Sequence, residues 1–271
     1  MPISIGGMVS MFANHTNYRA RLAVALQPSL VEVSRSSAFP LPGWAQFPSP
    51  PAMPNALLRL DLWLSAFVAD LQGITNIIRS DIGLTAQVLR IAACEIEESR
   101  GKNLSISEIV VLVGVERLRA LVAATESLPG RFKGYPESEA CERFWTHSRL
   151  TGMVAQELAY RSCVVSAEQA YLAGLLCHLG DLPSLLGWEI TETDAMDSRQ
   201  IGRHMAQAWG FPRDLVDVIA GDRDACRTEN SCALLAAVTE ADIWASRLEF
   251  LAARESESVR ANCPPYRLVR R

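Results

Sequence analysis

The sequence has no run of about 18 consecutive apolar residues, which is the minimum that a membrane-spanning helix needs. Its amino terminus shows no basic stretch followed by an apolar one, so nothing in it indicates a secretory signal. From these two absences we expect a cytoplasmic protein that makes no contact with a membrane.

Cysteine is present, but in no pattern that marks a disulfide framework. The seven cysteines are an odd number, and no two of them form a CxxC pair. Such residues are usually reduced and buried as small apolar side chains. Cys177 directly precedes His178, but adjacent residues on a helix point about 100° apart. We therefore do not predict a nucleophile and its base at this pair.

Basic residues are not in excess either. The formal net charge is -4 at pH 7, whereas proteins that bind nucleic acid usually carry a basic face. The basic carboxy-terminal end, with Arg267, Arg270 and Arg271, is more typical of a solvated tail than of a binding site. Nucleic acid is therefore not an expected partner, and salt-dependent DNA affinity is the test of that expectation.

The sequence also lacks segments in which apolar and polar residues alternate with the period of two that strands show. Helical stripes dominate residues 55–254 instead, and no repeat of solenoid spacing occurs. Two glycines and two prolines within residues 128–136 mark a loop between two groups of stripes. We therefore predict an all-α, multi-helix bundle with two helical lobes.

Prolines set the amino-terminal part of the chain apart. Six prolines lie within residues 39–54, and proline resists helix formation because it lacks the backbone donor. We predict that residues 1–54 form a proline-rich arm or linker, that residues 55–254 form the helical domain, and that residues 255–271 form a carboxy-terminal tail.

Local patterns within the domain give more specific expectations. Residues 57–71 are apolar nearly all round, and three isoleucines continue the pattern as far as Asp81, which predicts one long buried helix. Trp145 and Trp209 lie in apolar helical patterns, so we expect both in the core. Two further helix starts have the spacing of a capping box: Ser105 with Glu108, and Ser166 with Gln169.

Three polar residues lie on the otherwise apolar, inward stripes of their helices: His147, His178 and Asp242. A buried carboxylate without a partner is costly, so Asp242 should have one. Two histidines and an acid converging from three helices could bind a metal ion. The alternative is that each is an ordinary core residue satisfied by its own neighbours.

Several segments, in order along the chain, resemble motifs of the HDOD domain family. Residues 144–148 (FWTHS) resemble the family's fW-x-hS, and residues 173–180 (AGLLCHLG) resemble its aGLLHDiG. Three further segments show the same kind of match: residues 81–92, 106–114 and 201–212. This resemblance implies a bundle of the HD type over most of the predicted helical domain.

HDOD domains are related to HD phosphohydrolases, which place a His, an adjacent His–Asp pair and a later Asp around a metal centre. By this resemblance, His147 matches the first His, His178 the second and Asp242 the last Asp. Leu179 then stands where the motif has a metal-binding Asp, and leucine cannot coordinate a cation. We therefore expect a vestigial site with no metal and no cofactor, in which an aspartate placed at position 179 would restore a ligand.

Two further polar residues lie near these motifs. Asp181 lies one helical step beyond His178, and we interpret it as ending that helix, with substitution for the missing ligand as the alternative. His204 matches no histidine of the family, and we interpret it as a surface or interhelical residue.

The resemblance implies a non-enzymatic regulatory or scaffold module in bacterial-type signal transduction. Its expected partners are other signalling proteins, with a nucleotide-like ligand in the vestigial cleft as a second class. The alternative is a metal-dependent phosphohydrolase acting on a nucleotide or cyclic dinucleotide. It would use His147, His178 and Asp242 as ligands and a metal-activated water as the nucleophile. Metal content combined with phosphodiester turnover separates the two.

Overall fold

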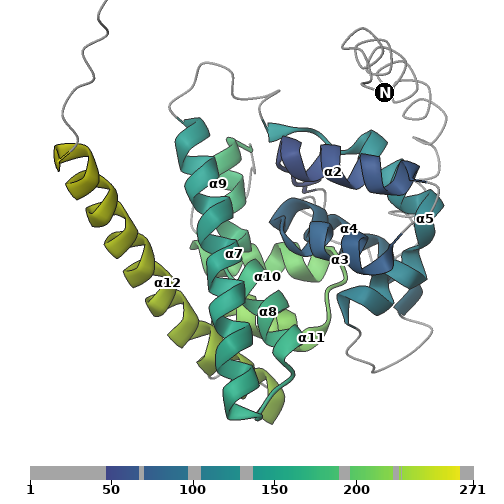
Figure 1. Cartoon of the computed structure of the whole chain (residues 1–271). Coiled ribbons are helices and arrows are strands. Elements are labelled where there is room, and N and C mark those ends of the chain that lie inside the picture. Colours follow the sequence, from purple (N-terminus) through teal and green to yellow (C-terminus); the bar gives the residue numbers. More distant parts are fainter. Residues whose placement is uncertain are drawn as a thin grey trace, which may run out of the picture.

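The chain folds into two helical lobes that lie side by side (Figure 1). The structure is a computed structural model, and it describes residues 47–66, 70–96, 105–128, 137–188, 196–221, 226 and 228–262. The predicted all-α bundle with two lobes is confirmed. Within these ranges the one strand-like feature is a single bridge between Ala52 and Ser127. In the same ranges, no helix combines the length and the apolar composition that a membrane crossing requires.

The first lobe consists of α2 (Pro54–Ser65), α3 (Leu71–Arg79), α4 (Ile82–Ile96) and α5 (Ile106–Ala124). The second lobe begins with α7 (Glu137–Ser162) and α8 (Ala167–Leu176), followed by the 3-10 turn η3 (Leu179–Asp181) and the short α9 (Leu182–Leu186). It ends with α10 (Ser198–Ala208), α11 (Arg213–Ala220) and the long α12 (Glu229–Asn262).

The first lobe corrects the prediction of one long buried helix between residue 57 and Asp81. The carboxylate of Asp70 accepts the backbone N–H groups of Gln72 at 3.0 Å and Gly73 at 3.2 Å, so a new helix begins there. In addition, Leu58 and Leu62 on α2 are 45% and 59% exposed, so the helix is not buried all round. The apolar residues at 67 and 68 lie outside the described ranges.

The end of the predicted arm is part of the folded core. Phe47 and Ala52 are buried, and the backbone of Ala52 bonds to Glu126 and Leu128, just after α5. The carbonyl of Pro50 accepts the side-chain amide of Gln87 on α4. A proline-rich strand can pack in this way because its carbonyls still accept hydrogen bonds although its prolines donate none. The rest of the predicted arm, residues 1–46, lies outside the described residues.

The two predicted capping boxes have different outcomes. Ser105 and Glu108 form a complete box at the start of α5, as expected. Ser166 is the N-cap residue of α8, but its side chain makes no capping hydrogen bond, so the second box is wrong. The helix start was correctly placed, because spacing identifies the boundary more reliably than it identifies the bond.

A buried aspartate joins the two lobes. Asp81 precedes α4 and accepts the backbone N–H groups of Leu84 and Met53, both at 2.8 Å, and the indole N–H of Trp145 on α7 at 3.1 Å. Trp145 and Trp209 are 4% and 5% exposed, which confirms their predicted place in the core. Burial raises the pKa of Asp81 to about 6, although the three N–H donors act in the opposite direction.

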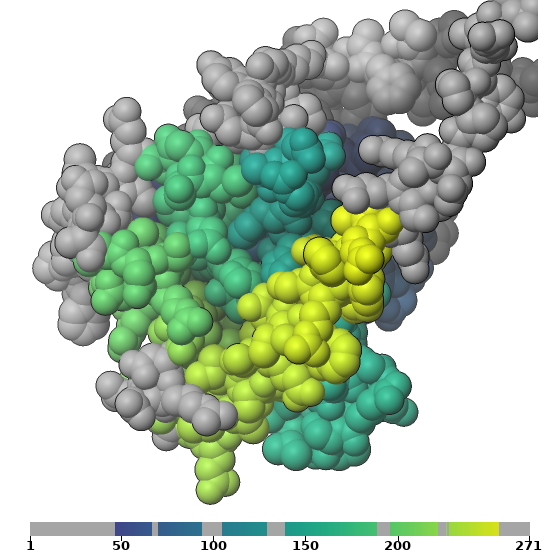
Figure 2. Space-filling model, turned by 90° about the vertical axis from the view of Figure 1, so that its left-hand side faces the viewer, coloured from purple at the N-terminus to yellow at the C-terminus, as the bar shows by residue number. Residues whose placement is uncertain are grey.

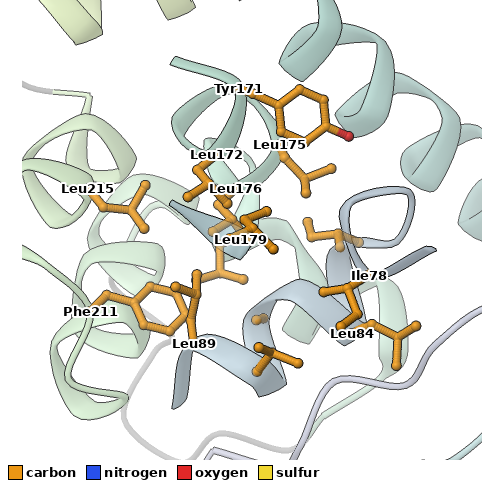
Figure 3. Packing of buried hydrophobic residues seen from close by; sticks show 14 of the residues in the cluster. Ile78, Leu84, Leu89, Tyr171, Leu172, Leu175, Leu176, Leu179, Phe211 and Leu215 are labelled. Atoms are coloured by element: carbon orange, nitrogen blue, oxygen red, sulfur yellow. The ribbon is translucent and has the colours of Figure 1, made fainter. Parts of the chain in front are cut away.

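The core is continuous across the lobes. Figure 3 shows leucines of α8 packed against apolar residues of α3 and α4, with Phe211 and Leu215 beside them. Within the second lobe, α7 and α8 approach very closely at Gly152 and Gly174. A Cβ added to Gly174 would lie only 2.9 Å from the Cα of Gly152. This close packing of α7 on α8 brings His147, on α7, beside His178, which follows α8, with ring centroids 5.2 Å apart.

Candidate functional site

The three polar residues predicted to face inward meet at one point. His147 lies on α7, His178 in the turn after α8, and Asp242 on α12. The Oδ1 atom of Asp242 lies 2.9 Å from Nε2 of His147 and 3.0 Å from Nε2 of His178. One ligand atom from each residue lies within 4.8 Å of the other two.

Small residues allow α12 to reach this point. Ala241 and Ala245, on either side of Asp242 along the helix, are fully buried. Alanine side chains at these positions let the backbone of α12 lie close to α7 and α8. The carboxylate of Asp242 therefore reaches both imidazoles from the third helix of the site.

Two further carboxylates complete the group, and the sequence did not assign them this role. Oε2 of Glu249 lies 3.1 Å from Nδ1 of His147, and Oδ2 of Asp181 lies 3.5 Å from Nδ1 of His178. Each imidazole thus lies between Asp242 on one side and a second acid on the other. Glu249 could have been found, because it lies seven residues, about two helical turns, after Asp242 on the same face.

The neighbouring acids favour the charged form of both imidazoles. Asp242, and to a lesser extent Glu249, raises the pKa of His147. Asp181 and Asp242 raise the pKa of His178, and His178 in turn lowers the pKa of Asp181. The two histidines lower the pKa of the Asp242 carboxyl, His147 more than His178. The pairing therefore favours imidazolium at both histidines and carboxylate at Asp181 and Asp242.

Solvent reaches the group from one side. The side chains of His147, His178 and Asp242 are 19%, 31% and 38% exposed, so none of them is fully buried. A ligand could therefore approach without any rearrangement of the core. Two imidazole nitrogens and a carboxylate oxygen are also a donor set that suits a single transition-metal ion.

Leu179 does not lie at this site. Its side chain is completely buried in the hydrophobic core (Figure 3), where it packs with the leucines of α8. The expectation that position 179 belongs to the site, and that an aspartate there would return a ligand, is therefore corrected. The backbone turns between His178 and Leu179, so the two adjacent side chains point to different environments.

The glycine after Leu179 shows how the motif fits the chain. Gly180 lies against α10 so tightly that a Cβ would overlap the carbonyl oxygen of Ser198. Aligned letter by letter, AGLLCHLG places this residue at the glycine that ends aGLLHDiG. Counted back from it, Leu179 occupies the motif's apolar position, His178 the position of the Asp, and Cys177 the position of the His. The register first inferred from sequence is displaced by one residue.

The other residues singled out from sequence lie outside the cluster of ligand atoms. The thiol of Cys177 donates to the carbonyl of Gly174 at 3.1 Å. His204 lies on α10, partly buried, and burial lowers its pKa. Asp181 follows the end of α8, as expected, and its side chain makes no capping bond at the start of α9 but faces His178 instead.

Comparisons with known proteins agree with this fold. A family model for the HDOD domain matches residues 51–189. The MmoQ response regulator from Methylococcus capsulatus str. Bath is 20% identical, over 73% of this chain and 87% of that chain, with a TM-score of 0.58. A virulence factor from Campylobacter jejuni subsp. jejuni is 15% identical, over 79% and 89%, with a TM-score of 0.54. No curated protein matches the sequence. At such low identity the two structures establish the shared fold alone.

Proposed function

Because the chain belongs to the HDOD domain family, we propose that it is a non-enzymatic regulatory or scaffold module of bacterial-type signal transduction in the cytoplasm. One observation carries the proposal: His178 occupies the position of the motif's metal-binding Asp, and the carboxylate of Asp181 lies at the outer nitrogen of that imidazole and not among the converging ligand atoms. Cys177 and His178 stand at the positions of the motif's His–Asp pair, and Leu179 is in the core. Of the two positions at which the motif has an aspartate, only the last, Asp242, then carries an acid in this chain.

The hydrogen bonds of the group support a structural role. Asp242 accepts from both imidazoles, and each outer ring nitrogen faces Glu249 or Asp181. The group connects α7, the turn after α8, and α12, so it fastens the long last helix to the rest of its lobe. A module of this kind would act through partners, which we propose are other signalling proteins. A nucleotide-like ligand on the open side is a second class, and neither nucleic acid nor a membrane is expected.

The test is an assay of the purified full chain for metal and for turnover. We expect no stoichiometric transition metal by elemental analysis, and no hydrolysis of cyclic dinucleotides or nucleotides with added manganese or iron. Affinity capture from the native host should instead recover a signalling protein that binds the purified chain directly. Tightly bound metal together with turnover would refute the proposal.

One observation favours the alternative, a metal-dependent phosphohydrolase acting on a nucleotide or cyclic dinucleotide. The ligand atoms of His147, His178 and Asp242 converge within 4.8 Å. Glu249 and Asp181 lie at the outer nitrogens, where carboxylates commonly orient metal-binding histidines. These residues fit one metal ion, which would supply an activated water when bound. In that case Glu249 and Asp181 would hold the protons on Nδ1, so that both Nε2 atoms face the ion.

A matched pair of variants distinguishes the two functions. His178→Ala removes a candidate ligand, whereas His204→Ala removes a histidine of α10 outside the group. Turnover that requires His178 but not His204 would support the hydrolase. Equal traces of activity in both variants and in the parent protein would indicate a contaminant and leave the regulatory proposal standing.

A further inference from the structure

The outward face of α12 is apolar where the helix leaves the lobe. Among the described residues, Ala245 is the last buried side chain on this helix. Four large apolar side chains around and beyond it are about half exposed or more: Ile243 (49%), Trp244 (46%), Phe250 (62%) and Leu251 (54%). In Figure 2 this helix, drawn in yellow, lies along the outside of the second lobe. Clustered exposed apolar side chains of this kind mark interaction surfaces.

The polar group of the site does not account for this face. Successive helical residues are about 100° apart, so Asp242 and Glu249 lie on the inner side of the same turns and the four apolar residues on the outer side. The face also carries charge at its two ends, with Glu240 before it and Arg254 after it, both exposed. Apart from Arg247, the middle of the face is apolar, and together with the opposite charges at its ends this suggests a partner with the same features in reverse order.

We propose that this face pairs with the same face of a second copy of the chain, antiparallel, about a two-fold axis near Arg247. Positions on the same side of the face and at nearly equal distances from the axis then meet. Ile243 of one copy packs on Phe250 of the other, and Trp244 packs on Leu251, because the members of each pair lie at similar angles and at heights that differ by one residue, about 1.5 Å on an ideal helix. Each contact occurs twice, as a two-fold interface requires.

The charges agree with this arrangement. Glu240 of each copy lies at the same height as Arg254 of the other, so two intermolecular ion pairs close the ends of the interface. Arg247 lies at the axis, where two guanidinium groups would repel each other. However, this guanidinium stacks on the Trp244 ring of its own chain, 5.4 Å from the ring centre. The cation–π contact draws it sideways and away from its counterpart.

The size of the face limits the strength of the dimer. Stable interfaces usually bury about 800 Å² on each partner, and about four turns of a single helix offer less. We therefore expect a weak dimer whose population rises with protein concentration. The interface is independent of metal binding and of turnover. The result of the dimerisation experiment therefore does not depend on whether the chain is a regulatory module or a hydrolase.

Sedimentation equilibrium of the full chain across a range of concentrations tests the proposal. The apparent mass should rise from 29.7 kDa toward twice that value. Glu240→Arg and Arg254→Glu each place like charges across the interface and should weaken the dimer by roughly tenfold or more. The double variant should restore it, because the pair is then reversed rather than lost. Circular dichroism confirms that each variant is folded.

Two apolar substitutions complete the design. Trp244→Glu should abolish the dimer, whereas Leu62→Glu, at a comparably exposed leucine of α2 (59%), should leave it unchanged. A monomer at every concentration overturns the proposal, as does a dimer that neither Trp244→Glu nor Glu240→Arg weakens. Failure of the double variant to recover overturns the antiparallel register. If residues 1–46 of the same chain covered this face, the full chain would be a monomer and would dimerise only after that segment is removed. This result would also overturn the proposal.

Discussion

The indole N–H of Trp145 donates to Oδ2 of Asp81 across 3.1 Å, and this bond joins α7 of the second lobe to the start of α4 in the first. The same oxygen accepts the backbone N–H of Met53, so the segment before α2 is held at the same point. A single buried carboxylate thus organises three parts of the chain that are far apart in sequence.

Replacing that carboxylate should destabilise the protein strongly. Asp81→Ala leaves three N–H groups near the core without their acceptor, and each unsatisfied donor costs about 1–3 kcal/mol. We expect a loss of at least about 3 kcal/mol in the free energy of unfolding, measured by urea denaturation. The matched control is Asp70→Ala at the exposed cap of α3, which should cost about 1 kcal/mol. Equal effects of the two substitutions would contradict the role of Asp81.

The pKa of Asp81 predicts a specific pH dependence. Because burial raises this pKa from 3.8 to about 6, the native protein holds a proton that the unfolded chain has released between these values. The stabilisation from this proton is fully present below pH 3.8 and is lost as the pH rises through 6. Asp81→Asn cannot titrate, so the stability of the parent protein relative to this variant should fall by up to about 3 kcal/mol over that window. A constant difference from pH 4 to 7 would show that the carboxyl titrates normally.

The imidazoles of the site should titrate together through Asp242. In the metal-free protein we expect both His147 and His178 to have a pKa above the ordinary 6.5, measured by NMR of the ring protons. Their stabilising contribution is present below pH 6.5 and is lost as the pH rises through the raised values. Asp242→Asn should lower both pKa values, whereas Glu240→Gln, on the outer side of the same helix, should not. Unchanged histidine titration in Asp242→Asn would contradict the shared hydrogen bonds.

Removing the shared acceptor should also weaken the fold. Asp242→Ala leaves two half-buried imidazoles without their common partner, at a cost of roughly 1–3 kcal/mol. Thermal or urea unfolding measures the loss, and Ile243→Ala, one position along and exposed, is the control with little expected effect. If the two variants were equally stable, the group would not be fastening α12 to its lobe.

An aspartate at position 179 should destabilise the protein rather than restore a metal site. Leu179 is completely buried among leucines, so Leu179→Asp would transfer a carboxylate into an apolar environment. The expected cost is roughly 4 kcal/mol or more, with no gain in divalent-metal affinity by calorimetry. Leu62→Asp at the surface should stay within about 0.5 kcal/mol of the parent. Tighter metal binding in a folded Leu179→Asp protein would restore the register first inferred from sequence.

The sequence by itself determined the helical class, the two lobes, the buried tryptophans and the inward orientation of His147, His178 and Asp242. The helical class, the two tryptophans, His147 and Asp242 follow from periodicity along one helix at a time, since about 3.6 residues per turn decides which side chains share a face. His178 lies just beyond its predicted helix, in the turn after α8. The lobe boundary followed from glycine and proline, which act on the local backbone.

Only the tertiary structure decided which of these faces meet. Glu249 and Asp181 joined the group because α12 and the turn after α8 pack against α7 at a particular height and angle, and no local pattern encodes that geometry. The turn at Gly180 is a second feature that only the packing decides. Gly180 is packed so tightly against α10 that Leu179 points into the core, while His178 points to the site. The register itself is readable from the sequence, since AGLLCHLG aligned letter by letter with aGLLHDiG places Leu179 at the apolar position. Only the packing shows that Leu179 enters the core and His178 the site, because the environment of each side chain is decided by the elements that pack around the turn.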